Sequence, residues 1–169
     1  MAALPNATPV PVEEYLNTSY DPDVEYVDGV LVERKMGDWL HSLVQSNILF
    51  ALRRKYPHLK VVAELRSKVA ETRFRLPDVC ALLAPPPTRY LADAAYLVVE
   101  VLSQDDRQSE LMEKLKEYDS RGVTNIWVVD PRLRTVWVFR MGTLAEVGGD
   151  TVSTADGNVT LLYSEIFAE

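Results

Sequence analysis

The stretch AYLVVEVL, residues 95–102, decides the fold of this chain. Its apolar residues are continuous, which is typical of a strand buried on both faces near the centre of a sheet. A helical pattern follows, beginning at Asp105 or Asp106 and ending at Gly122, and residues 123–129 return to a strand pattern. The apolar stripe of that helix consists of Leu111, Leu115 and Tyr118. Strand, helix and strand in this order predict a crossover unit with two parallel strands.

Hairpins flank the crossover unit on both sides. Before it, Asp28-Gly29 separates two β-rich runs within residues 24–33, and Asp-Gly is a strong hairpin signal because the turn needs positive φ. After it, residues 130–133 turn the chain into a further strand, residues 135–139. The sequence therefore predicts an α/β fold, a mixed β-sheet flanked by helices with peripheral β-hairpins.

The remaining segments complete this outline. A short helix is expected around Tyr15, and a long amphipathic helix begins after the capping residue Asp38 and stops at Pro57. Two extended segments follow, residues 59–70 and 74–83, and the proline-rich loop 84–88 must lie at the rim of a sheet. We expect residues 1–10 to form a flexible leader and residues 11–169 a single domain.

Composition excludes several classes of protein. The longest apolar stretch, residues 94–102, is interrupted by Glu100 and is far shorter than the roughly 20 residues of a membrane-spanning helix, so no membrane role is expected. The N-terminal residues lack the apolar core of a signal peptide, and the single cysteine, Cys80, suits core packing in a reducing cytoplasm. A cytoplasmic location is therefore the expectation.

The charge of the chain is unevenly distributed. The net charge of −7 argues against a protein held on nucleic acid by bulk charge alone. Residues 53–75, however, contain eight basic and only two acidic residues, a local charge of +6. These cations either keep solvated strand faces soluble or form a phosphate-facing strip. The candidate nucleic-acid-binding residues of such a strip are Arg66, Lys68, Arg73 and Arg75.

Two acids stand in apolar surroundings. Glu100 interrupts the predicted central strand, and ionising it there without a partner would cost several kcal/mol. Its partner is either a buried Lys or Arg or a metal ion shared with a second carboxylate. Asp78, in the mostly apolar run after Pro77, supplies that carboxylate if the two strands are neighbours. Hard oxygen ligands of this kind select Mg²⁺ or Mn²⁺.

The order of these motifs resembles a known family. Pro77-Asp78 is followed by Glu100-Val101-Leu102-Ser103, then by a helix segment EKLKEY (113–118), and then by IWVVDP (126–131). This combination resembles the Uma-type family of restriction-endonuclease-like proteins in the PD-(D/E)xK nuclease superfamily. The resemblance implies a restriction-endonuclease-like core in which the Asp and Glu bind Mg²⁺ and a Lys positions or activates the attacking water. We expect the carbonyl of Val101 to be a further metal ligand.

The lysine of that pattern is displaced in this chain. Leu102 stands where the superfamily carries a lysine two residues after the Glu. Lys114, on the following helix, is the candidate substitute, because its long stem could reach back over the sheet. The alternative is an exposed helix lysine that pairs with Glu110 or Glu117.

Weaker candidates surround this set. Glu33, at the end of the first hairpin, is either a third acid or a solvated charge. His41 and Gln45 lie one turn apart on the long helix, and His41 is either structural or in contact with substrate or water. Glu64 is either an accessory acid or a counter-charge for Arg66. Trp127 and Trp137 are expected in the core or in a dimer contact.

Two classes of function follow from this sequence. The first is a Mg²⁺- or Mn²⁺-dependent phosphodiesterase acting on DNA, with Asp78, Glu100 and Lys114 as catalytic residues and a homodimer as the expected assembly. The second is a non-catalytic protein that keeps the fold and works as a dimeric binding or regulatory module. Leu102 and the net charge of −7 favour the second class.

Overall fold

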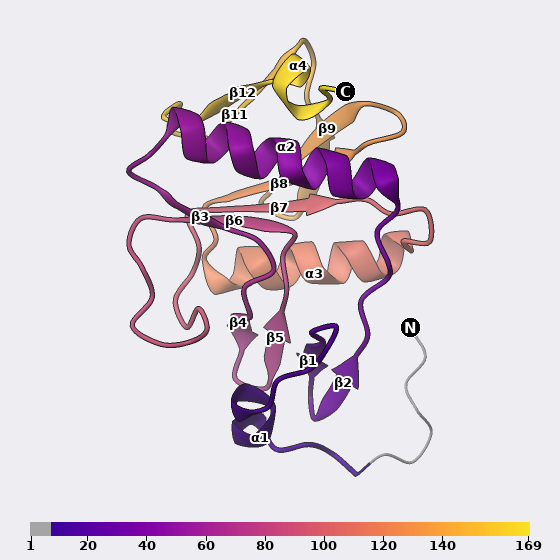
Figure 1. The fold of residues 1–169 in the computed structure, drawn as a ribbon, viewed down its shortest axis with the longest axis vertical. Helices are drawn as coiled ribbons and strands as arrows, with labels where there is room; N and C mark the ends of the chain where they lie inside the picture. The colour runs from indigo at the N-terminus through magenta and orange to yellow at the C-terminus, as the bar shows by residue number, and fades with distance from the viewer. Residues whose placement is uncertain (1–7) are drawn as a thin grey trace.

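A six-stranded mixed sheet lies at the centre of the fold, with a long helix on each face (Figure 1). The computed structural model describes residues 8–169, so most of the expected leader, residues 1–7, lies outside the described residues. The strand order is β10-β9-β8-β7-β6-β3. The strand bounds are β3 Lys60–Val62, β6 Val79–Leu82, β7 Leu97–Val101, β8 Asn125–Asp130, β9 Thr135–Arg140 and β10 Thr143–Glu146.

The predicted crossover unit is confirmed. Strands β7 and β8 are parallel and are joined by helix α3 (Gln108–Arg121), whereas β8–β9 and β6–β7 are antiparallel. All five residues of β7 are buried, as its continuous apolar run indicates. Gly122 adopts the left-handed conformation that ends α3. The helix begins later than expected, because the carboxylate of Asp106 accepts a hydrogen bond from the Ser103 N–H instead of capping the helix.

A smaller four-stranded sheet packs beside the α3 face (Figure 1). Its order is β2-β1-β5-β4, and the short helix α1 (Val12–Asn17) lies next to it. The hairpin at Asp28-Gly29 is confirmed, with positive φ at both turn residues. The strand bounds are β1 Glu25–Val27, β2 Val30–Val32, β4 Ser67–Ala70 and β5 Arg73–Arg75.

The two extended segments predicted at 59–70 and 74–83 are each divided between the sheets. The first contributes β3 to the large sheet and β4 to the small one, and the chain changes direction at Glu64, whose φ is +54°. The second divides at residues 76–78, around Pro77, into β5 and β6. The prediction of two continuous segments was therefore wrong, because two sheets share them.

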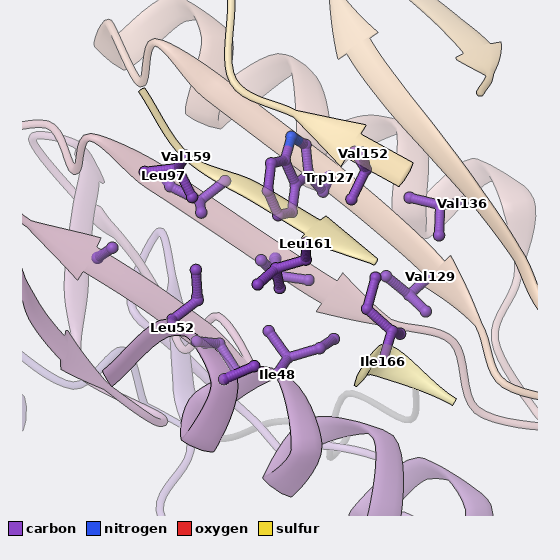
Figure 2. Close-up of a cluster of buried hydrophobic side chains, with 14 of the residues drawn as sticks. Ile48, Leu52, Leu97, Trp127, Val129, Val136, Val152, Val159, Leu161 and Ile166 are labelled. Carbon is purple, nitrogen blue, oxygen red and sulfur yellow. The ribbon is translucent and has the colours of Figure 1, made fainter. Parts of the chain in front are cut away.

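Helix α2 (Trp39–Lys55) covers the other face of the large sheet, where an apolar core is closed by the C-terminal segment (Figure 2). The Asp38 side chain caps α2 by accepting a hydrogen bond from the His41 N–H, as predicted. The C-terminal elements, which the sequence analysis did not predict, are β11 (Thr151–Ser153), β12 (Thr160–Leu162) and α4 (Tyr163–Ile166). They contribute Val152, Leu161 and Ile166 to this core, in which Trp127 is also buried.

The opposite face of the large sheet packs against α3. Val98 on β7 and Cys80 on β6 lie there in contact with a cluster that includes Leu115 and Tyr118. Side chains alternate between the two faces of a strand, so even-numbered residues of β6 and β7 point toward α3. This parity fixes the side on which Asp78 and Glu100 emerge.

The C-terminal end of α3 provides a test of the fold. Replacing Gly122 with Ala should destabilise the protein by about 1–2 kcal/mol, because an L-residue is strained at its φ of +99°. The added Cβ would meet Ala94 Cβ at 3.9 Å, an ordinary contact, so the cost lies in the backbone. Urea unfolding measures the change. The matched control is Gly148→Ala, whose Cβ meets nothing within 4 Å and which should alter stability by less than about 0.5 kcal/mol.

Candidate active site

The pairing of β6 with β7 brings the two predicted acids together. Val79 pairs with Val99 in antiparallel register, and continuing that register by one residue places Asp78 opposite Glu100. Both side chains lie on the α3 side, and both residues are buried. The backbone N–H of Val101 donates a hydrogen bond of 2.7 Å to Oδ2 of Asp78. The end of β7 thus fixes the orientation of the Asp78 carboxylate.

Asp78 is also contacted by two nitrogen-bearing side chains from outside the sheet. Arg34 Nη2 lies 2.7 Å from its Oδ1, and His41 Nε2 lies 3.4 Å from the same oxygen. Burial by itself would raise the pKa of Asp78, but the contacts with His41, Arg34 and the Val101 N–H together lower it below its ordinary value. Asp78 is therefore ionised in the folded protein at neutral pH.

Glu100 has the opposite character. Burial, together with the negative charges of Asp78 and Glu25, raises the pKa of Glu100 to about 7, although Lys114 opposes the change. Its Oε1 accepts a hydrogen bond of 2.7 Å from the Tyr118 hydroxyl. Two neighbouring carboxylates with pKa values displaced in opposite directions are a common property of catalytic pairs.

Lys114 points from α3 toward these acids. Its Nζ lies 2.8 Å from Oε1 of Glu25 and 3.8 Å from Oε2 of Glu100. Burial disfavours its charge, but Glu100 and Glu25 outweigh that cost and raise the pKa of Lys114 above its usual range. The side chain therefore remains an ammonium at neutral pH, directed into the pocket that Asp78 and Glu100 also line.

Glu25, which the sequence analysis did not single out, connects the small sheet to this pocket. Its Oε1 accepts from Lys114 and from the Leu76 N–H, and its Oε2 lies 3.0 Å from Arg75 Nη1. Arg75 in turn contacts Glu117 of α3 through Nε at 2.6 Å. The signal that could have found Glu25 is the one that found Glu100, an acid within a β-rich apolar run.

The accessory candidates differ in how closely they contact Asp78. Gln45 donates a hydrogen bond of 2.9 Å to the backbone carbonyl of Asp78, next to His41 on the same helix face. Glu64 Oε1 lies 3.0 Å from Arg34 Nη1, which also binds Asp78, and 3.5 Å from the same Gln45 amide nitrogen. Glu33 is exposed and lines the pocket. Arg34, which binds both Asp78 and Glu64, was missed because nothing local distinguishes it from other hairpin-end cations.

The four cations of the expected basic strip all contact acidic side chains. Arg66 binds Asp23, Lys68 binds Glu71, and Arg73 binds Asp28 together with Glu113 and Glu117 of α3. Arg75 is 1% exposed and holds Glu25 and Glu117 instead of facing solvent. Their part in nucleic-acid binding stays a prediction.

The donor set around Asp78 and Glu100 is compatible with a small hard cation. Among residues 8–169, no group of three or more His, Cys, Asp or Glu side chains converges as metal ligands. Mg²⁺, however, is commonly held by one or two carboxylates while it keeps several waters. Two buried carboxylates in one pocket, beside the backbone of Val101, meet that requirement.

Within residues 8–169, no helix has the length and apolar character needed to cross a membrane.

The architecture is shared with a solved structure of a nuclease-like protein. The crystal structure titled "putative nuclease belonging to DUF820", from Anabaena variabilis, superposes with a TM-score of 0.81 at 20% sequence identity, covering 95% of this chain and 98% of that one. At this identity the likeness establishes the fold, and it confirms the predicted fold class. A cryoEM structure of a DrdV–DNA complex matches with a TM-score of 0.34 and 14% identity over 64% of this chain and 82% of that one, too weakly to support an argument.

The family is established by sequence. Residues 12–161 match the family model Uma2, described as "Putative restriction endonuclease". The chain belongs to this family, as the motifs around Asp78, Glu100 and IWVVDP indicated. A comparison with curated proteins gave no match.

The raised pKa of Glu100 predicts how stability depends on pH. The folded protein keeps the Glu100 proton up to about pH 7, whereas the unfolded chain loses it near 4.5, so the free energy of unfolding should fall as pH rises between these values. His41, whose pKa is raised against burial by Asp78, acts in the same direction. Glu100→Gln should flatten the decline by up to roughly 3 kcal/mol. Urea unfolding at pH 5 to 8 measures this, and a slope identical to wild type would contradict it.

Proposed function

We propose that this protein is a divalent-metal-dependent DNA endonuclease that hydrolyses phosphodiester bonds. The observation that carries the proposal is the pocket itself: buried Asp78 and Glu100 lie side by side, and the ammonium of Lys114 is held next to them by Glu25. Membership of a family described as "Putative restriction endonuclease" supports this assignment.

The metal-binding residues in this proposal are Asp78, Glu100 and the carbonyl of Val101. A bound Mg²⁺ or Mn²⁺ would polarise the phosphoryl oxygen and lower the pKa of its bound water. Asp78, kept ionised by its donors, supplies a permanent negative charge to this site. Glu100 supplies a second charge whenever its proton is released, which a nearby cation favours.

Lys114 is the third catalytic residue in this proposal. Because its pKa is raised by Glu100 and Glu25, it serves as a hydrogen-bond donor that orients the attacking water, and not as a base. It takes the part of the lysine that Leu102 replaces. Glu25 and Tyr118 act through their neighbours: Glu25 fixes Lys114, and Tyr118 fixes the Glu100 carboxylate.

DNA is the proposed partner, and a homodimer in the cytoplasm belongs to the same proposal. Arg66, directly before β4, Lys68 on β4 and Arg73 on β5 are half-buried and are proposed to contribute positive charge along the DNA backbone. The dimer is proposed to use the exposed side chains of Trp39 and Phe50 on α2.

A second candidate function is a binding or regulatory module without catalysis. Leu102 at the lysine position favours it, and so do the donors that already occupy both carboxylate oxygens of Asp78. The two candidates differ in their response to metal, because a true site stabilises the folded state by mass action.

The metal site predicts the behaviour of Asp78→Asn. Wild-type protein should melt at a higher temperature in millimolar Mn²⁺ than in EDTA, and Asp78→Asn should lose that increase because it loses a ligand charge. The variant should also melt below wild type in EDTA, since Arg34 would lose its buried carboxylate partner and keep only the half-exposed Glu64. Differential scanning fluorimetry measures both values. An equal Mn²⁺ shift in the two proteins would exclude Asp78 as a ligand.

The proposed role of Lys114 predicts that its substitution affects DNA hydrolysis but not Mn²⁺ binding. Lys114→Met should retain Mn²⁺ binding, because a cation beside two acids is removed, while DNA hydrolysis falls about 100-fold or more. The matched control is Lys116→Met on the exposed face of α3, which should hydrolyse DNA like wild type. Gel assays with a labelled duplex over several divalent metals measure the rates. Wild-type activity in the Lys114 variant would exclude its catalytic role, and an inactive wild type would favour the binding module.

A further inference from the structure

One guanidinium connects two carboxylates, of which Asp78 lines the pocket and Glu64 lies outside its lining. Arg34 belongs to the coil between β2 and α2, and its Nη2 lies 2.7 Å from Oδ1 of Asp78. Its Nη1 lies 3.0 Å from Oε1 of Glu64. The Glu64 side chain is 50% exposed, whereas that of Asp78 is 4% exposed, so Arg34 spans an inner and an outer anion.

The inner contact occupies the atom that a metal ion needs. Oδ2 of Asp78 accepts the Val101 N–H, and Arg34 and His41 both approach Oδ1, so a cation bound to this carboxylate would lie close to the guanidinium. A divalent cation on Oδ1 and a guanidinium at 2.7 Å from the same atom would repel each other strongly. This repulsion favours the departure of Arg34 from Asp78 when a metal ion binds.

The outer contact provides a place for Arg34 to remain. Glu64 is held beside the site by its own backbone, because its N–H donates to the Pro77 carbonyl at 3.1 Å, one residue before Asp78. With Nη1 kept on Glu64, the other N–H groups of the guanidinium become available within the pocket. A guanidinium offers five donors in a planar fork that matches two phosphate oxygens.

We propose that Arg34 is a phosphate-binding residue of this pocket, which Asp78 retains until a divalent cation displaces it. This inference rests on the proposed endonuclease function and adds a substrate-binding residue to it. Without metal, Arg34 neutralises Asp78; with metal, it contacts the phosphodiester while Glu64 anchors it. Metal binding and phosphate capture are thereby coupled through one side chain.

The first test measures Mn²⁺ affinity by calorimetry in the full-length protein without DNA. Arg34→Gln keeps a hydrogen-bond donor near Asp78 but removes the charge, so Mn²⁺ should bind about tenfold or more tightly. The matched control is Lys35→Gln. Lys35 lines the same pocket, but its ammonium contacts Asp106 and Glu110 and not Asp78. Equal tightening in both variants would overturn the proposal, because general electrostatics would then explain it.

Glu64 provides an independent arm of the same test. Glu64→Gln weakens the outer anchor, so Arg34 should stay on Asp78 more of the time and Mn²⁺ affinity should fall several-fold. In the Arg34→Gln background the same substitution should have little effect, because the effect of Glu64 passes through Arg34. An equal loss in both backgrounds would show that Glu64 acts without Arg34.

The second test measures binding of a fluorescein-labelled DNA duplex in Ca²⁺ and in EDTA at constant ionic strength. Arg34→Gln should bind the duplex about tenfold more weakly than wild type in Ca²⁺ and equally well in EDTA, because Arg34 is engaged with Asp78 in the metal-free protein. A loss of the same size in both buffers, or no loss in either, would overturn the coupling.

The outcomes separate this inference from the function on which it rests. If neither the wild-type protein nor Arg34→Gln binds Mn²⁺, the metal site and the endonuclease proposal are both refuted. Mn²⁺ binding that depends on Asp78 but is equally tight in wild type and Arg34→Gln would refute the role of Arg34 alone. Melting temperatures in EDTA and in Mn²⁺ report the folding of each variant, with Mn²⁺ expected to restore the stability that Arg34→Gln loses.

Discussion

Repulsion between the buried carboxylates of Asp78 and Glu100 is the constraint on which this structure depends. Antiparallel pairing of β6 with β7 places them opposite each other, where neither is well solvated. Two uncompensated charges in that position would destabilise the fold by several kcal/mol. The surrounding donors relieve this cost in different ways, because Asp78 receives cations and a backbone N–H while Glu100 receives a hydroxyl and holds its proton to a higher pH.

The small sheet contributes an essential part of this compensation. Glu25 on β1 holds Lys114 near Glu100, and Arg75 on β5 holds Glu25 while it also binds Glu117. The four side chains form a chain of alternating charge that fastens the small sheet to α3. A peripheral hairpin thus determines where the ammonium of the candidate active site lies.

The two faces of the large sheet have different tasks. Helix α2 and the C-terminal segment close an apolar core on one face, which supplies stability through buried aliphatic and aromatic surface (Figure 2). The face toward α3 carries the ionisable groups at the end of β7 and an apolar cluster farther along the strand. Successive side chains of β6 and β7 point to opposite faces of the sheet, so the apolar core and the ionisable groups lie on different faces.

Local patterns in the sequence determined the crossover unit, the Asp28-Gly29 hairpin, the Asp38 cap and the placement of two acids in apolar surroundings, Glu100 within β7 and Asp78 directly before β6. Each depends on residues close together in the chain, and such patterns have direct physical causes: an apolar run requires burial, and an Asp-Gly turn requires positive φ. The resemblance to the nuclease family, together with the length of the side chain and its place on the helix, singled out Lys114 as a candidate to reach the acids. The sequence alone left open whether it would do so or pair along its helix.

Tertiary structure decided the rest. The division of residues 59–70 and 74–83 between two sheets, the burial of Arg75, and the contacts of Glu25 and Arg34 all join segments far apart in the chain. Arg34 and Asp78, for example, are separated by 44 positions. A charged side chain carries no local sign of its partner, because ion pairs form wherever strand register and sheet packing bring opposite charges together. The sequence therefore predicted the two acids Asp78 and Glu100, whereas the contacts of Glu25, Arg34 and Arg75 depend on how the two sheets are arranged around α3.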